Sequence, residues 1–352
     1  MSLLIPLAIS LSSSRGYSVD EVREVLTQAR NICDKLGNVS TLYPVLRGLC
    51  TFHIVRNDLD IAGELARRCI RIGEETTNIP YLVEGHNALG YVLYAQGELE
   101  QARIHLERAL DLYEENEDSG LVFPTEQDPK MASACLLAHT LHLQGDMVGA
   151  AARYEQSVAW ARKLNRPFDL GYALLVASYY CTLNKRYLQA KALAEEAMDI
   201  SQTHGFAYYC LCDQVALGIA IAHLGQIEQA IRILEPAFAG LVAMGGKYGW
   251  VCFGLGELAS CYAVTDRLEL ARTTIDAAIH EAINVGERVY LSFLHRIRAD
   301  IMAKTPNPDW EVVERELCRA ISVAQSLGAA TFVADAQARW NEIFTRRAIA
   351  NG

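Results

Sequence analysis

The chain has 352 residues, more than one compact domain usually holds, so we expect either several domains or one elongated array of repeats. Hydrophobic residues make up 51% and charged residues 21% of the sequence, which excludes a disordered chain and a collagen-like one. The formal net charge of −10 argues against a nucleic-acid partner, because contacts to phosphates depend on Lys and Arg.

The first residues are apolar but lack the basic segment of a secretory signal, and no uncharged run reaches the roughly 18 to 20 residues of a membrane span. Most of the ten cysteines lie within apolar helical patterns, and none forms a CxxC pair. Such thiols are typical of reduced cysteines that pack as small hydrophobic side chains. We therefore expect a cytoplasmic protein without a membrane partner.

From residue 22 onward, one pattern returns about every 40 residues. Its clearest copy has a small residue at Gly90, a turn at Gly97, and then Ala102, Leu106 and Ala109 on one face of a second helix. The first small or apolar residue of each second helix sets the period: Val22, Ala62, Ala102, Ala150, Ala190, Ala230, Ala271 and Val313. Successive intervals between these positions are 40, 40, 48, 40, 40, 41 and 42 residues.

Each copy predicts an antiparallel pair of helices. Small residues on both helices let the two backbones approach closely, and the turn glycine between them can adopt the left-handed conformation that ends a helix. The apolar face of a pair stays exposed until the next pair stacks on it, so the pattern predicts a solenoid. We expect an all-α fold of about eight helix pairs within a single solenoid spanning residues 1–352. The repeats are predicted at about 1–37, 40–77, 79–115, 128–165, 166–205, 206–245, 247–286 and 287–328, with a capping helix at 329–352.

The single interval of 48 residues contains an insertion at 114–129. This segment has an acidic run followed by the apolar residues Leu121, Val122 and Phe123, with Gly and Pro between helices. Two interpretations remain open. The apolar residues either pack over neighbouring helices, or the segment is a docking loop, since long loops often carry function.

The repeated frame resembles the tetratricopeptide repeat in a long version of about 40 residues. The residues that carry this resemblance include Leu89-Gly90 with Ala102, Leu106 and Ala109, and Leu217-Gly218 with Ala230, Leu234 and Ala237. The chain also resembles the C-terminal repeat region of bacterial signalling proteins that join an adenylate or guanylate cyclase to an AAA or STAND ATPase. The segments that carry this second resemblance are 43–49, 84–90, 105–107 and 127–129, whereas Cys50 departs from it. No cyclase, kinase or ATPase segment is present, so the activity of such proteins does not transfer.

The resemblance implies a right-handed superhelix whose first helices line an inner groove. Applied to this sequence, the frame places an aromatic and hydrogen-bonding strip in the groove. The candidate binding residues are Arg47, Asn87, Tyr91, Tyr94, His139, His142, Tyr179 and Arg298. Tyrosines also fill helix junctions, so packing between repeats is the competing interpretation for about half of them.

Motifs for chemistry are weak in this sequence. The segment 240–248 has Gly246 where a phosphate-binding loop needs Lys, and it follows a predicted helix instead of a strand. Cys135, His139 and His142 share one helix face, but a structural zinc site needs a fourth ligand and none has suitable spacing. These three side chains are therefore either packed or, less readily, metal ligands. We expect no catalytic, cofactor or metal site.

The sequence favours a non-catalytic scaffold that binds a protein, a peptide segment or a neighbouring domain of the same signalling polypeptide. The alternative is a repeat domain that senses a small effector molecule. The shape of the groove distinguishes them, because a broad channel suits a peptide and a closed apolar pocket with few polar groups suits a small molecule.

Overall fold

The computed structural model describes residues 19–36, 39–117, 120–123, 125, 127–245 and 250–351, together with Leu4, Ile5, Leu7, Ala8 and Leu11. Most of residues 1–18, in the first predicted repeat, therefore lies outside the described residues. The described part of the chain is all helical, with no strand. The helices are α2 (Asp20–Leu36), α3 (Val39–Val55), α4 (Leu59–Thr76), α5 (Ile79–Gln96), α6 (Leu99–Glu114), α7 (Pro129–Gln144), α8 (Met147–Leu164), α9 (Pro167–Leu183), α10 (Tyr187–His204), α11 (Ala207–His223), α12 (Ile227–Ala243), α13 (Trp250–Val264), α14 (Leu268–Val285), α15 (Leu291–Ala303), α16 (Trp310–Ser326) and α17 (Ala330–Asn351).

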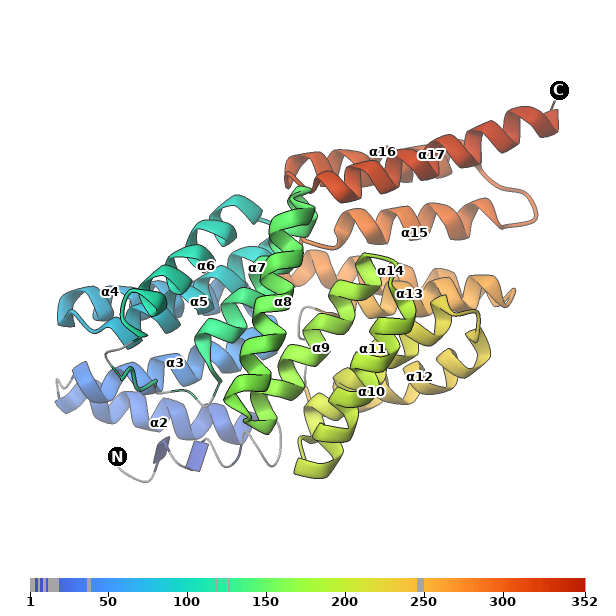
Figure 1. The fold of residues 1–352 in the computed structure, drawn as a ribbon. Coiled ribbons are helices and arrows are strands. Elements are labelled where there is room, and N and C mark those ends of the chain that lie inside the picture. The colour runs from blue at the N-terminus through green and yellow to red at the C-terminus, as the bar shows by residue number, and fades with distance from the viewer. Residues whose placement is uncertain are drawn as a thin grey trace.

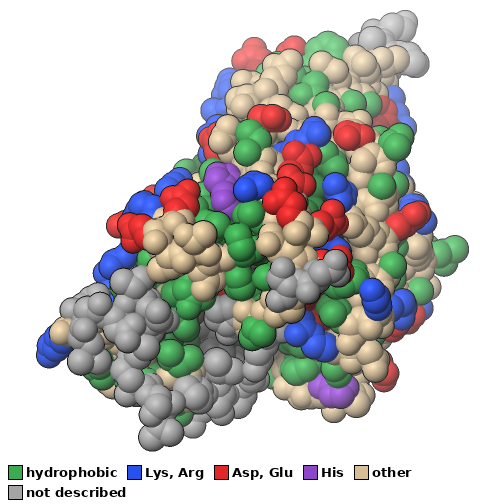
Figure 2. Space-filling model, turned by 60° about the vertical axis from the view of Figure 1, so that its left-hand side comes forward, with side chains coloured by type: hydrophobic (Ala, Val, Ile, Leu, Met, Phe, Trp, Pro, Cys, Tyr) green, Lys and Arg blue, Asp and Glu red, His purple; other side chains and the backbone are tan. Residues whose placement is uncertain are grey.

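Consecutive helices pack as antiparallel pairs, from α3 with α4 to α15 with α16. Figure 1 shows these pairs stacked side by side from the N-terminal to the C-terminal end, so that the chain winds into a superhelix. The prediction of an all-α repeat solenoid is confirmed. Lys and Arg are interspersed with Asp and Glu over the described part of the face in Figure 2.

The two helices of each pair touch at small residues. The residues that set the period, from Val22 to Val313, are all at most 2% exposed. Gly90 illustrates why the contact requires small side chains. A Cβ atom added at this position would lie 2.6 Å from the Leu106 side chain, closer than carbon atoms approach without displacement. The 40-residue repeat is therefore a repeat of close backbone contacts.

Two repeats carry a polar atom at this small position and compensate for it. The Ser178 hydroxyl donates a hydrogen bond of 2.8 Å to the carbonyl oxygen of Ala190. The Cys50 thiol lies 3.4 Å from the carbonyl oxygen of Ala62 in the same arrangement. In both cases the buried polar group has a partner on the opposite helix. Without such a partner, the buried polar group would destabilise the fold.

The turns inside the pairs have the conformation that the sequence predicts. The residue at the turn position has a positive φ in six repeats, and in three of them it is not glycine. Asn is often tolerated there, but Lys and Asp take a left-handed conformation at a cost that the surrounding packing must offset. The six residues are Asn57, Gly97, Gly145, Lys185, Gly225 and Asp266.

The insertion at 114–129 packs against the solenoid through part of its apolar segment. The Phe123 ring stacks on Tyr113 at a centroid distance of 5.3 Å. The backbone N–H of Thr125 donates a 3.0 Å hydrogen bond to the buried carboxylate of Glu84. Val122, directly before Phe123, is 81% exposed. The described residues of the insertion thus form a connection held at two points.

The superhelix turns far enough to bring its C-terminal helices back onto its N-terminal half. The backbone N–H groups of Arg288 and Val289, just before α15, both donate to the carbonyl oxygen of Ala95 at the end of α5. The Thr331 hydroxyl on α17 donates to the carbonyl oxygen of Leu143 on α7. Figure 1 shows α17 reaching back to the end of α7. These contacts close the inner channel on one side.

A charge placed at the close contact tests the repeat phase. We expect Ala230→Asp to lower the free energy of unfolding by about 3 to 5 kcal/mol, because the carboxylate would be buried between α11 and α12 without a partner. Ala239→Asp is the matched control, since Ala239 is exposed on the same helix. Urea unfolding measures both variants, and equal stabilities would contradict the assigned contact.

Candidate functional site

Aromatic side chains fill the centre of the channel. Trp250, the first residue of α13, stacks on Tyr179 at 4.4 Å and lies edge-on to His139 at 4.8 Å. The Tyr94 and Tyr290 hydroxyls are 2.8 Å apart and form a hydrogen bond across the channel. We call these five residues the aromatic plug. All are at most 6% exposed, so the plug is a packed core element.

The open groove expected at Tyr94, His139 and Tyr179 is therefore a prediction that the structure corrects. The physical reason is the closure of the superhelix, which brings Trp250 and Tyr290 from the C-terminal half onto these side chains. His139 also uses its ring for packing, since its Nε2 lies 3.1 Å from the carbonyl oxygen of Val176. Burial lowers the pKa of His139 to about 3, so the ring is neutral.

The cysteine and histidine face of α7 serves packing. The Cys135 thiol lies 3.8 Å from the Met131 sulfur, and His139 bonds to the backbone of α9. Over the part of the chain that the structure describes, no three His, Cys, Asp or Glu side chains are arranged to hold a metal ion. All ten cysteines are free thiols.

The other predicted groove residues lie in different places. Arg47, Asn87 and Tyr91 line a pocket of about 70 Å³ on one side of the aromatic plug. His142 lines a larger cleft on the other side. Arg298 forms ion pairs with Asp276 at 2.9 Å and Glu316 at 3.6 Å and lines neither of these spaces.

The larger space, which we call the open cleft, has a volume of about 430 Å³. It lies between α17 and the C-terminal ends of α7, α9 and α11. Its apolar surface is largely aromatic, with Phe253, Phe293 and Phe332 nearly buried. The remaining lining residues are His142, Met147, Thr182, Leu183, Lys185, Tyr187, His223, Glu257, Arg296, Thr331, Ala334, Asp335 and Ala338.

Two pairs of oppositely charged groups line the open cleft. The His223 Nε2 lies 3.1 Å from the buried Glu257 carboxylate, and the His223 ring stacks on Tyr187 at 4.5 Å. Burial opposes protonation of His223, but the Glu257 carboxylate outweighs it and raises the pKa of the imidazole. Arg296 lies over the Phe293 ring and 2.8 Å from Asp335. The cleft therefore presents aromatic surface beside both signs of charge.

His142 contributes a polar atom that the protein itself leaves unused. It is 4% exposed, and its Nδ1 has no hydrogen-bond partner among the described residues. Burial lowers the pKa of His142 to about 4, so the ring is neutral near pH 7. A buried nitrogen without a partner costs free energy, which a hydrogen-bonding ligand would recover.

Sequence reasoning identified His142 but missed most of the cleft. The groove frame counts positions within first helices, whereas Lys185 and Tyr187 lie in a turn and at the start of a second helix. Asp335 lies on α17, which the repeat pattern predicts only as a cap. The sequence offered one signal for these residues, a basic residue at the turn followed by an aromatic residue at the start of the second helix. This signal does not distinguish a residue that lines a cleft from one that is exposed to solvent at the edge of the solenoid.

Comparison with known proteins supports the repeat assignment. The family profile described as tetratricopeptide repeat matches residues 83–116, which span most of α5 and all of α6. A search of curated protein sequences finds no significant match.

Solved structures resemble the chain in fold at low sequence identity. A Rap protein complexed with competence and sporulation factor has a TM-score of 0.59 and 12% identity, covering 99% of this chain and 98% of that one. A STAND protein with a tetratricopeptide repeat sensor from Pyrococcus horikoshii has a TM-score of 0.47 and 17% identity, covering 94% of this chain and 53% of that one. Repeats of a putative kinesin light chain from Podosopora anserina have a TM-score of 0.40 and 20% identity, covering 56% of this chain and 94% of that one.

The profile match and the similarity to the Rap protein support a tetratricopeptide-like helical repeat fold. Among the described helices, none combines the length and apolar character that a membrane span requires.

The channel closure contains a carboxyl group that makes stability depend on pH. Glu287 is fully buried and accepts a 2.8 Å hydrogen bond from the Asn57 amide, and burial raises its pKa from 4.5 to about 8. The folded protein therefore keeps a proton that the unfolded chain releases between these pH values, so stability falls as pH rises from about 4.5 to about 8.

We expect Glu287→Gln to remove this pH dependence. At pH values above the raised pKa, the variant should be more stable than the parent, by an amount on the order of a few kcal/mol, and the difference should shrink at acid pH. Urea unfolding across the pH range measures this, with the exposed Glu269→Gln as control. A difference that is independent of pH would show that Glu287 is not protonated in the folded state.

Proposed function

We propose that this protein is a non-catalytic scaffold that binds a short segment of a partner protein in the open cleft. The observation that carries the proposal is the open cleft, in which His142 and two pairs of oppositely charged side chains surround Phe253, Phe293 and Phe332. A volume of about 430 Å³ is within the range of about 300 to 1,000 Å³ that is typical of ligand sites.

The chemistry of the cleft suits a peptide. An apolar side chain of the ligand would pack on the exposed surfaces of Met147 and Tyr187 and on the accessible edges of the phenylalanine rings. The backbone of the ligand would hydrogen-bond to His142. Its charged groups would exchange contacts with the His223–Glu257 and Arg296–Asp335 pairs, which offer both signs of charge.

We further propose that the scaffold serves a bacterial signalling system that contains an ATPase or a cyclase. The support for this context is the sequence resemblance of segments 43–49, 84–90, 105–107 and 127–129 to the repeat regions of such proteins. In that setting the ligand segment belongs to a separate signalling protein or to a neighbouring domain of the same polypeptide. The scaffold would act in the cytoplasm.

A small effector molecule is the second candidate ligand. The observation that favours it is the pocket lined by Arg47, Asn87 and Tyr91, which is too small for a peptide. This pocket lies apart from the open cleft, so the two functions do not exclude each other.

Selection from a random peptide library tests the peptide function. We expect selected peptides to bind the parent with a saturable affinity that falls tenfold or more in Lys185→Ala with Tyr187→Ala, since both side chains line the cleft and are partly exposed. Titration calorimetry measures the affinity.

The matched control is Arg232→Ala, because Arg232 is exposed on α12 and lines none of the described pockets. Thermal melting must show that all variants remain folded. Peptides that bind the double variant as well as the parent would place the interaction outside the open cleft.

A further inference from the structure

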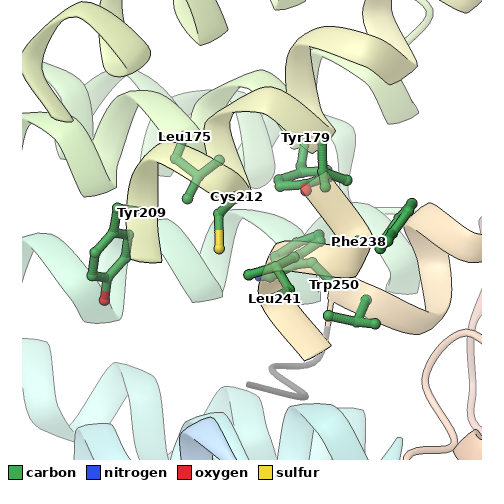
Figure 3. A pocket seen from close by; sticks show the side chains of 9 residues that line it. Leu175, Tyr179, Tyr209, Cys212, Phe238, Leu241 and Trp250 are labelled. Carbon is green, nitrogen blue, oxygen red and sulfur yellow. The ribbon is translucent and has the colours of Figure 1, made fainter. Parts of the chain in front are cut away.

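The interior next to the open cleft leaves little room for a longer ligand. Figure 3 shows Tyr179 and Trp250, two residues of the packed aromatic plug, beside a space that Leu175, Cys212 and Leu241 also border. This space has a volume of about 20 Å³, room for about one water molecule. A peptide held in the open cleft therefore cannot continue past the plug, and the rest of it must lie on the outer surface at the mouth of the cleft.

Acidic residues stand at the start of most second helices. The residue two positions before each residue that sets the period is acidic in six of the eight repeats. These six residues are Asp20, Asp60, Glu100, Glu228, Glu269 and Glu311. Their shared position makes them comparable from repeat to repeat.

Four of these acidic residues link one repeat to the next. Each contacts a polar or basic side chain at the turn of the following repeat. The contacts join Asp20 to Arg56 at 3.5 Å, Asp60 to Gln96 at 3.2 Å, Glu100 to Gln144 at 3.0 Å and Glu228 to Arg267 at 2.8 Å. The position therefore serves contacts between neighbouring repeats along the solenoid.

Two repeats that border the open cleft lack this acidic residue. Val148 on α8 and Leu188 on α10 stand in its place, and they are 83% and 75% exposed. The residues directly before them, Met147 and Tyr187, line the open cleft. We call these four residues the apolar rim. Single exposed apolar residues are common, but two such pairs along one edge of a cleft are typical of an interaction surface.

The missing acidic residue also leaves basic residues without a partner. Arg186 precedes α10 as Arg267 precedes α14. Val148 has the position of Glu228, the residue with which Arg267 pairs. Arg186 and its neighbour Lys185 are exposed, and neither forms an ion pair with a described residue. On a chain of net charge −10, the apolar rim is thus flanked by two unpaired cations.

From this arrangement we infer that the apolar rim binds an acidic continuation of the peptide that the open cleft holds. An apolar side chain of the peptide packs on Val148 and Leu188. An acidic side chain of the peptide pairs with Arg186, in the place of the carboxylate that other repeats supply themselves. The inference rests on the peptide function proposed for the open cleft and adds the chemistry of its ligand.

The charges select an acidic peptide over other partners. A guanidinium binds a carboxylate through its planar fork of N–H donors, whereas a basic side chain would be repelled by Lys185 and Arg186. A nucleic-acid backbone needs more cations than these two. Because the ion pair is exposed, its contribution is modest and falls with added salt, so contact with the apolar residues supplies most of the affinity.

Restoring the missing acidic residue tests the inference on peptides selected from a random library against the parent. We expect these peptides to carry an acidic residue beside an apolar one. Val148→Glu should weaken their binding tenfold or more, because it removes an apolar contact and gives Arg186 a partner within the protein. The melting temperature should not fall, since Val148 is exposed. Val242→Glu is the matched control, because Val242 is 72% exposed on α12 and lies outside the cleft and the rim.

A charge exchange identifies the partner of Arg186. Arg186→Glu should weaken binding of the selected peptides, and replacing the acidic residue of the peptide by Lys should recover most of the loss. Titration calorimetry measures the four combinations as a double-mutant cycle. An effect of Arg186 on the fold alone would not be recovered by a change in the peptide.

Variants on the two sides separate the rim from the cleft. Ala334→Trp fills the open cleft from α17 and leaves the rim unchanged. Binding that is lost in Ala334→Trp but equal in Val148→Glu and Val242→Glu would overturn the inference and leave the peptide function of the cleft standing. Binding that is lost in Val148→Glu alone would support the rim and place the peptide outside the cleft. The absence of saturable peptide binding to the parent would contradict both proposals.

Discussion

Two helical backbones can approach closely only where side chains are small, and this constraint shapes the whole molecule. In six repeats a glycine, alanine, serine or cysteine on the first helix meets an alanine on the second, as Gly90 meets Ala102 and Leu106. This contact fixes the position of the two helices of a pair relative to each other. Each pair is then rotated by a similar angle relative to the pair before it. By the start of the last pair, α15 with α16, the accumulated rotation has returned Glu287 to Tyr290 to the ends of α3 and α5.

That return divides the interior into separate spaces. The aromatic plug around Trp250 occupies the middle, the open cleft lies under α17, and the pocket lined by Arg47, Asn87 and Tyr91 lies beside α3 and α5. The plug is costly to open, because it combines ring stacking with a buried pair of hydrogen-bonded hydroxyls. A repeat protein of this kind therefore has two distinct surfaces toward ligands where an open superhelix would have one continuous groove.

The buried polar groups show where the protein retains capacity for recognition. Ser178 and Cys50 find partners on the opposite helix, so they serve packing alone. His142 Nδ1 and Arg47 Nε do not, and both residues line a cavity. A polar group that is buried, unpaired and next to empty space is destabilising unless a ligand completes it. His142 and Arg47 are therefore the two cavity-lining residues whose buried polar atoms a ligand could pair.

The sequence by itself determined the helices, their pairing and the turns, because each depends on residues within about 40 positions of one another. Gly97, Lys185 and Asp266 could be assigned to left-handed turns from their place in the frame alone. The fate of Tyr94, His139 and Tyr179 could not be assigned, because it depends on Tyr290 and Trp250, up to 196 residues away in the chain. A small error in the rotation per repeat would leave the channel open. The rotation summed over all the repeats therefore decides whether a residue expected in the groove is buried in the core or lines a binding site. A local sequence pattern does not contain this information.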